Sequence, residues 1–174
     1  MRKIVLNTET TGLSPDEGHR IVELAAIEIN GWEITQKRIH RYFNPEREID
    51  TGASEVHGLT LVRLKDEPTF DEFAHEISEF IRDAELIIHN APFDLGFLNS
   101  EFERAGLPPV KSICAKVTDT LQLARTQNPD EKNDLDALCE RYEIACLQRT
   151  SHGALLDAEL LAELYLKMTK RMLH

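Results

Sequence analysis

The sequence Ile4-Val5-Leu6-Asn7-Thr8-Glu9-Thr10-Thr11-Gly12 predicts a short buried strand that ends in a turn. Successive strand residues point to opposite faces, so the side chains of Asn7 and Glu9 project from the same face. Both lie near the carboxyl end of the strand, where open α/β sheets usually bind their ligands. Two polar side chains at that place indicate a functional site.

Two longer apolar segments follow, at residues 20–29 and 32–43, and the dipeptide Asn30-Gly31 joins them. Asn-Gly between two such segments is the strongest short signal for a β-hairpin, so we expect two antiparallel strands. Farther along the chain, Leu86-Ile87-Ile88 predicts a compact buried strand, and residues 112–115 predict another.

Helices alternate with the later strands. Thr69-Phe70-Asp71-Glu72 is a capping box, and apolar residues recur after it at helical spacing up to Ile81. Residues 44–68, between the hairpin and this box, look like a loop. The other predicted helices cover residues 92–105, 118–125, 133–142 and 151–172. A hairpin followed by alternating helices and strands indicates an α/β fold whose sheet has an antiparallel part.

Composition limits the class of protein. The 174 residues are 41% hydrophobic and contain no repeat or long linker, which indicates one domain over residues 1–174. No segment approaches the ~20 apolar residues of a membrane span and no signal peptide is visible, so we expect no membrane contact and a cytoplasmic location. Three cysteines without CxxC spacing indicate neither a disulfide framework nor a zinc site.

The net charge of −11 argues against a strong nucleic-acid binder, because such proteins neutralise phosphates with Lys and Arg. A site that holds divalent cations reverses the local field, so an acidic protein can still receive a phosphodiester there. Affinity for the rest of a strand would then be weak or supplied by a partner.

Two more acidic residues interrupt segments that are expected to be structured. Asp94 falls in the first turn of a predicted helix, where an acid usually complements the macrodipole, and His152 alone is a common surface histidine. Asp157 lies on an apolar stripe of the last helix, and a buried carboxylate is costly unless it is paired or coordinates a metal. Its neighbours on that stripe are Ala154, Leu161, Leu164 and Met168. Together with the strand-end pair, these residues suggest a two-metal phosphodiesterase site.

Three segments resemble the motifs of the DEDD exonuclease superfamily in its histidine form. They are residues 6–12 (LNTETTG), 89–94 (HNAPFD) and 152–158 (HGALLDA), the last with a histidine five residues before its aspartate. Between the motifs, further segments look like the proofreading epsilon subunits of bacterial DNA polymerase III. These segments are Val56-His57-Gly58, Lys116-Val117-Thr118-Asp119-Thr120, and Leu135-Asp136-Ala137-Leu138-Cys139 with Tyr142. The resemblance covers nearly the whole chain.

The resemblance implies a ribonuclease H-like fold, with a mixed five-stranded sheet flanked by helices. It implies a proofreading 3′–5′ exodeoxyribonuclease that removes mononucleotides from DNA 3′ ends. The acidic charge of the chain leads us to expect a preference for single-stranded or frayed ends. The implied partners are the polymerase catalytic subunit and a small accessory subunit. We expect a single exonuclease domain without the polymerase-docking tail that the family subunit usually carries.

The resemblance also assigns roles to residues. Two Mg²⁺ or Mn²⁺ ions would take oxygen ligands, as hard cations do, and His152 would be the general base. The implied metal ligands are Asn7, Glu9, Asp94 and Asp157. The implied substrate-binding residues are Thr10, His57, Asn90 and Phe93.

Asn7 departs from the family pattern, which has an aspartate at this position. An amide offers one neutral oxygen where a carboxylate offers two oxygens and a charge, so several kcal/mol of transition-state stabilisation, or roughly a thousandfold in rate, are at risk. The chain is then either an exonuclease inactivated at Asn7 by substitution, which lets substrate persist, or a natural variant with reduced activity. Retention of every other motif residue favours inactivation.

Two alternatives stay open on the sequence. RNA-trimming members of the superfamily share the same carboxylates and histidine, so an RNA 3′ exonuclease is one. The other is a catalytically inactive module that only binds 3′ ends. The segments between the motifs favour the DNA enzyme.

Overall fold

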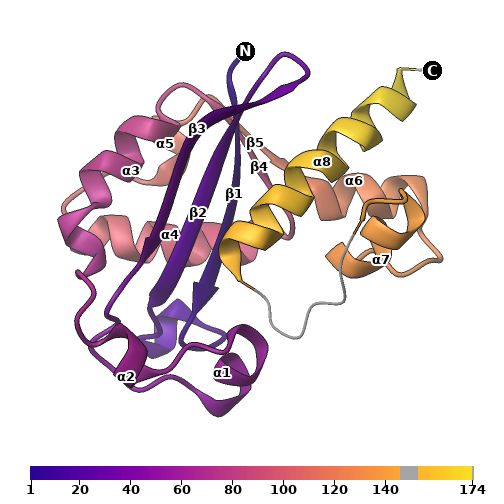
Figure 1. Cartoon of the computed structure of the whole chain (residues 1–174). Helices are drawn as coiled ribbons and strands as arrows, with labels where there is room; N and C mark the ends of the chain where they lie inside the picture. Colours follow the sequence, from indigo (N-terminus) through magenta and orange to yellow (C-terminus); the bar gives the residue numbers. More distant parts are fainter. Residues whose placement is uncertain (146–152, 174) are drawn as a thin grey trace.

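A five-stranded mixed sheet forms the centre of the computed structural model, which describes residues 1–145 and 153–173 (Figure 1). Its strands are β1 (Lys3–Thr10), β2 (Ile21–Asn30), β3 (Glu33–Tyr42), β4 (Glu85–Ile88) and β5 (Lys116–Asp119). They lie in the order β3-β2-β1-β4-β5. β2 runs antiparallel to β1 and β3, whereas β4 and β5 continue the sheet in parallel with β1. The predicted mixed α/β sheet is confirmed.

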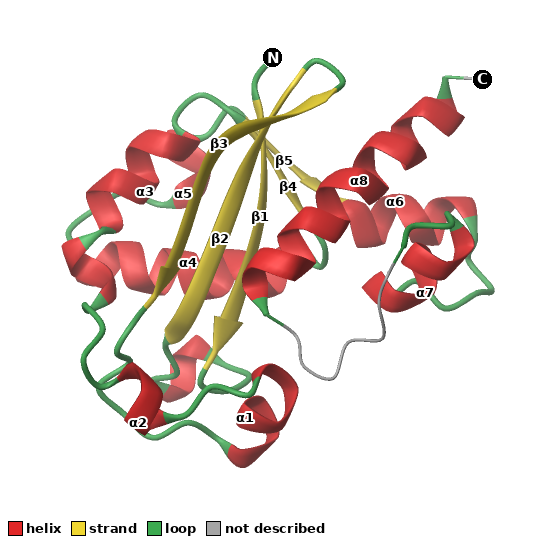
Figure 2. Cartoon of the chain, viewed as in Figure 1, coloured by secondary structure: helices red, strands yellow, loops and turns green. Residues whose placement is uncertain are grey.

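Helices flank the sheet on both faces (Figure 2). The α-helices are α1 (Thr51–His57), α2 (Leu61–Leu64), α3 (Ala74–Ile81), α4 (Ala91–Arg104), α5 (Val110–Ile113), α6 (Thr120–Gln127), α7 (Leu135–Arg141) and α8 (Ala154–Met172). Two short 3₁₀ turns are η1 (Pro15–Glu17) and η2 (Phe70–Glu72). Among the described residues, no helix has both the length and the apolar character needed to cross a membrane.

Alternate residues of β1 enter two different cores. Ile4 and Leu6 pack with apolar side chains of α3, α4 and α5 on one face, and Val5 packs with α6, α7 and α8 on the other. All three side chains are fully buried, and each contributes roughly 1.5–3 kcal/mol by leaving water. The amino half of β1 is thereby fixed between two cores, one on each face of the sheet.

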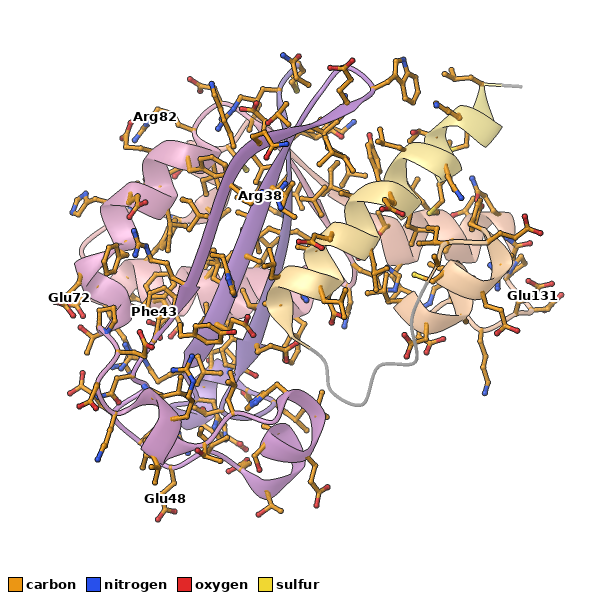
Figure 3. The ribbon with its side chains drawn as sticks, viewed as in Figure 1. Arg38, Phe43, Glu48, Glu72, Arg82 and Glu131 are labelled. Atoms are coloured by element: carbon orange, nitrogen blue, oxygen red, sulfur yellow. The ribbon has the colours of Figure 1, made fainter. Side chains whose placement is uncertain are left out.

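Side chains at the surface are largely charged (Figure 3). Glu48, Glu72, Arg82 and Glu131 are exposed at the periphery, whereas Phe43 is fully buried. The Phe43 ring packs against Phe70 with centroids 4.9 Å apart, so the residue after β3 contacts η2 through aromatic packing.

The predictions for residues 112–115 and for the start of the following helix are wrong. Residues 110–113 form α5, and the strand comes later as β5, which takes Thr118 and Asp119 from the predicted helix. Val110 and Ile113 are both buried, at the three-residue spacing of one helix face. Pairing of β5 with β4 then overrides the weak local preference of residues 116–119.

Part of the predicted loop is also helical, because α1 and α2 lie within residues 44–68. Both helices are too short to be stable by themselves, so contacts with the rest of the fold hold them. The capping box at Thr69 and Glu72 is confirmed, although it opens η2 and the α-helix begins only at Ala74.

Candidate active site

The end of β1 carries the first set of site residues. Asn7 and Glu9 are partly buried and face α8, whereas Thr8 and Thr10 are buried on the opposite face. On the neighbouring strand β2, Glu9 is opposite Glu23 in the antiparallel register. The predicted sharing of one face by Asn7 and Glu9 agrees with this strand geometry.

The turn after β1 is fixed by hydrogen bonds and by close packing. The Thr10 hydroxyl donates to the Gly12 carbonyl over 2.7 Å, and the Thr11 amide donates to the Arg20 carbonyl over 2.8 Å. A Cβ atom on Gly12 would lie 2.3 Å from the His19 ring, so only glycine allows that approach. The Thr-Thr-Gly sequence is therefore required by the shape of the turn.

His19 links this turn to the start of α1. Its Nδ1 lies 2.8 Å from the Thr11 hydroxyl, and its Nε2 lies 3.2 Å from a carboxylate oxygen of Asp50, the residue before α1. The Thr11 hydroxyl also accepts the Arg20 amide at 2.9 Å. The result is a continuous chain of hydrogen bonds from β1 to α1.

Asp94 lies in the first turn of α4 and is only 4% exposed. Its carboxylate accepts a 2.7 Å hydrogen bond from the Thr8 hydroxyl of β1. Burial raises the pKa of Asp94 from 3.8 to about 7; the Thr8 bond opposes this rise and the Asp119 carboxylate adds to it. A buried carboxyl that is this easily protonated is well suited to exchange its proton for a cation.

Asn90 directly precedes α4 and adopts a left-handed backbone with φ of 66°. Its amide donates over 3.0 Å to Asp119, whose carboxylate also accepts the Leu121 amide at the start of α6. Asp119 thus holds the Asn90 turn and caps α6 together. Asn90 itself is exposed.

Asp157 lies in the first turn of α8 and is 7% exposed. The residues predicted to share its stripe are all buried; these are Ala154, Leu161, Leu164 and Met168. The apolar stripe is confirmed, and it packs α8 against β1 and β2. His152 lies outside the described residues.

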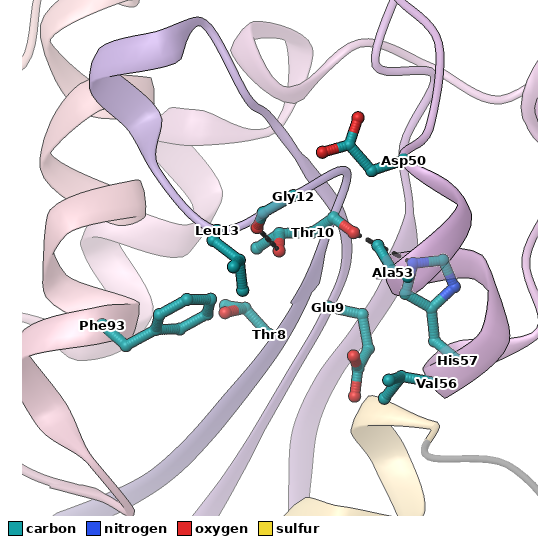
Figure 4. Close-up of a pocket in the computed structure, with 11 residues that line it drawn as sticks. Thr8, Glu9, Thr10, Gly12, Leu13, Asp50, Ala53, Val56, His57 and Phe93 are labelled. Carbon is teal, nitrogen blue, oxygen red and sulfur yellow. Dashed lines mark hydrogen bonds between the residues drawn. The ribbon is translucent and has the colours of Figure 1, made fainter.

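A pocket of about 460 Å³ opens beside the end of β1 (Figure 4). Four of its lining residues belong to the predicted site: Glu9, Thr10, His57 and Phe93. The others are Thr8, Gly12, Leu13, Asp50, Gly52, Ala53 and Val56. Asn7, Asn90, Asp94 and Asp157 do not line this pocket.

His57 fastens α1 to the strand at one wall of the pocket. Its Nε2 donates to the Thr10 carbonyl over 2.9 Å, and its Nδ1 accepts the Leu59 amide over 3.0 Å. Burial lowers the pKa of His57, although the bond to Thr10 acts in the other direction. The ring is therefore neutral and offers its apolar surface, because both nitrogens are already used.

Two apolar residues of the pocket wall, Leu13 and Val56, were not predicted as site residues. Leu13 is 84% exposed and Val56 is 47% exposed, and both line the pocket. Phe93 stands across from them on α4, with its ring 5.1 Å from that of Phe97. Single exposed apolar residues produce no periodicity, and only the place of Val56 next to His57 gave a signal.

The donor atoms of the site suit a hard divalent cation. Glu9, Asp94 and Asp157 come from β1, α4 and α8 and supply only carboxylate oxygens. Over residues 1–145 and 153–173, no three His, Cys, Asp or Glu side chains are grouped closely enough to hold a metal ion. The Asp94 carboxylate is bonded to Thr8, whose side chain lies on the face of β1 opposite that of Glu9.

Comparison with known proteins gives a consistent result. The family model described as Exonuclease matches residues 4–165. The DNA polymerase III subunit epsilon of Escherichia coli (strain K12) is 49% identical over 174 residues, which cover 97% of this chain and 71% of that protein. The epsilon subunit of Rickettsia felis is 46% identical over 170 residues, covering 97% and 74%.

Solved structures agree on the fold. The zinc-bound complex of E. coli ExoI with single-stranded DNA has a TM-score of 0.86 at 17% identity and covers 99% of this chain and 41% of that one. Exonuclease X in complex with 5′ overhanging duplex DNA has a TM-score of 0.71 at 23% identity, with coverage of 97% and 92%. These structures support the predicted ribonuclease H-like fold. By its sequence, the chain belongs to the exonuclease family and is a close relative of the DNA polymerase III epsilon subunits.

Proposed function

We propose that this chain is a divalent-metal-dependent 3′–5′ exonuclease domain that removes mononucleotides from DNA 3′ ends in proofreading, with activity reduced by Asn7. One observation carries the proposal. The buried Asp94 carboxylate is bonded to Thr8 of β1 beside a pocket that Glu9 and Phe93 also line. A buried carboxylate that could bind a cation and a largely apolar pocket therefore lie next to each other at the end of β1.

The ligands proposed for two Mg²⁺ or Mn²⁺ ions are Asn7, Glu9, Asp94 and Asp157. When bound, such ions activate a water molecule and stabilise the leaving oxygen of a phosphodiester. Asp94 would give up its proton as a cation binds, because its pKa lies near 7. His152 is proposed as the base that accepts the proton of the attacking water.

The pocket is proposed to hold the terminal nucleotide. Leu13, Val56 and Phe93 supply apolar and aromatic surface against which a base can stack without selection of its identity. His57 and Thr10 hold that wall in place through their mutual hydrogen bond. This arrangement supports binding of any single-stranded or frayed 3′ end.

The epsilon relatives are named as subunits of DNA polymerase III. By that similarity, we propose that the chain works in the cytoplasm with a polymerase catalytic subunit and a small accessory subunit. The acidic net charge of −11 fits such delivery, because the domain has little positive surface with which to retain DNA by itself.

The test is the activity of the Asn7→Asp variant on end-labelled oligonucleotides with Mn²⁺. We expect a gain of roughly a thousandfold over the chain with Asn7, because a charged bidentate ligand is restored. Asn30→Asp, which adds the same charge at the exposed β2–β3 turn, is the matched control and should leave activity unchanged. Absence of metal-dependent release of mononucleotides by a folded Asn7→Asp variant would refute the proposed function.

Matched DNA and RNA oligonucleotides separate the two enzymatic readings. We expect the Asn7→Asp variant to degrade the DNA strand faster, and faster RNA cleavage would instead assign it to RNA 3′ ends. The alternative, a catalytically inactive module that only binds 3′ ends, rests on Asn7 alone. Retention of 3′ ends by the chain with Asn7, with no gain of cleavage on Asn7→Asp, would favour that reading.

A further inference from the structure

Glu23 of β2 is a buried carboxylate that none of the roles above uses. The residue is 2% exposed, and both of its carboxylate oxygens have partners. Oε1 accepts the Ala154 amide over 2.9 Å, and Oε2 lies 2.7 Å from Nε2 of His40 on β3. In the β1–β2 register, Glu23 is directly opposite Glu9.

The Ala154 amide is the first N–H of α8, and it needs an acceptor from outside the helix. The residue at the cap position is Gly153, which has no side chain, so α8 lacks a local side-chain cap. Glu23 supplies that acceptor from 131 residues earlier in the chain. A negative charge at this end of a helix is also favoured by the macrodipole.

The same helix end carries Asp157, whose amide donates to the Gly153 carbonyl in the first turn. Glu23 therefore holds the turn that bears Asp157 against the strand next to β1, directly opposite Glu9. Two like carboxylates opposite each other on a sheet normally repel. Here the Ala154 amide and the His40 ring are bonded to the two carboxylate oxygens of Glu23, which stabilises its charge beside Glu9.

We infer that Glu23 is a positioning residue, which anchors the N-terminus of α8 to the sheet and so sets the separation between Glu9 and Asp157. The inference rests on the proposed function, in which these two carboxylates hold divalent ions. Because both of its oxygens are engaged by protein groups, Glu23 acts through the helix and not as a ligand. Residues that orient metal ligands typically cost 10- to 100-fold in affinity or activity when they are changed.

Glu28 provides a matched control on the same strand. It is 5% exposed, bonds to Arg2 and Thr35, and lies five residues from Glu23, so it faces away from α8. Glu28→Ala removes a buried carboxylate without touching the helix anchor. General destabilisation of β2 should therefore affect both alanine variants alike.

The experiment compares Glu23→Ala, Glu23→Gln and Glu28→Ala in the Asn7→Asp protein. We expect Glu23→Ala to lower kcat about tenfold or more and to weaken Mn²⁺ binding about tenfold, with KM for a single-stranded oligonucleotide nearly unchanged. Glu23→Gln keeps an oxygen for the Ala154 amide and should restore most of both losses. Glu28→Ala should leave kcat and Mn²⁺ affinity close to the values of the parent protein.

Hydrogen exchange of the Ala154 amide tests the anchor separately from catalysis. It should be faster in Glu23→Ala than in Glu23→Gln or Glu28→Ala at matched global stability. Equal exchange in all three variants would overturn the inference, even if the parent protein proved inactive. If Glu23→Gln were as damaging as Glu23→Ala, Glu23 would be acting through its charge or as a ligand, and the positioning role would be wrong.

Discussion

The Thr8 hydroxyl on β1 donates a 2.7 Å hydrogen bond to the Asp94 carboxylate on α4, and this bond joins two motif segments that lie 86 residues apart. It satisfies one oxygen of a carboxyl group that burial otherwise disfavours in its charged form. The free energy of unfolding therefore depends on the protonation of Asp94, and so on pH.

We predict that the metal-free chain loses stability as pH rises from about 4 to about 7. The folded-state pKa of Asp94 is raised from 3.8 to about 7, so the folded chain binds more protons than the unfolded chain in this window. The full effect is about 4 kcal/mol at most. Urea unfolding in EDTA at several pH values, compared with Asp94→Asn, measures it; identical pH profiles for the two proteins would contradict the prediction.

We predict that residue 7 controls metal stoichiometry. The chain with Asn7 should bind divalent metal weakly, whereas Asn7→Asp should bind two ions, because an added carboxylate supplies charge and a second oxygen. Isothermal titration calorimetry with Mn²⁺ gives both stoichiometry and affinity. Equal values in the two proteins would mean that residue 7 is not a ligand.

We predict a general-base role for His152, on the basis of its spacing from Asp157. In the Asn7→Asp protein, His152→Ala should lower the rate roughly a hundredfold or more with little change in stability. The rate should also fall below about pH 6.5, the ordinary histidine pKa, if proton removal limits turnover. Single-turnover kinetics over pH test both points, and full activity of the variant would place the base elsewhere.

We predict that His57 contributes mainly to structure. His57→Ala removes the bonds to the Thr10 carbonyl and the Leu59 amide, and should lower the free energy of unfolding by about 1–3 kcal/mol. His75→Ala, at an exposed position of α3, is the control and should change stability by less than about 0.5 kcal/mol. Chemical denaturation measures both free energies of unfolding. Equal small effects would show that the two hydrogen bonds of His57 contribute nothing to stability.

We predict that the Asn7→Asp domain alone prefers mismatched or single-stranded 3′ ends and releases DNA after very few cleavages. Unpairing a terminus costs a few kcal/mol, and a chain of net charge −11 has few contacts with which to offset that cost. Product ladders from excess end-labelled DNA measure both properties. Long runs of cleavage in single encounters, or equal rates on paired and mismatched ends, would refute this.

Elements with a clear apolar, periodic or turn pattern could be predicted from the sequence, including the four-residue β4, whereas several short helices could not. β1, the β2–β3 hairpin, α4 and α8 were found because their periodicity or turn signal extends over many residues. The helices α1, α2 and α5 span 4 to 7 residues each, and contacts made elsewhere in the fold stabilise them. Their boundaries were accordingly missed or displaced.

For the site as well, local patterns could be interpreted from the sequence, whereas tertiary contacts could not. Motif spacing led us to propose Glu9, Asp94 and Asp157 as ligands, but it could not reveal that Thr8 bonds to Asp94 or that Glu23 caps α8. These two contacts depend on which strand face meets which helix, and therefore on tertiary structure. Leu13 was missed because an isolated exposed leucine produces no pattern.

The long sequence separation between Glu23 and Ala154 has a consequence for how the domain is made. β1, β2 and β3 are contiguous and can pair as soon as they leave the ribosome, but the turn that bears Asp157 has no anchor on the sheet until α8 has been synthesised. A nascent or truncated chain can hold the first motif without a competent site. With Asp157 as a proposed ligand, nuclease activity is expected only after the last helix has folded, and it would then report on completed folding.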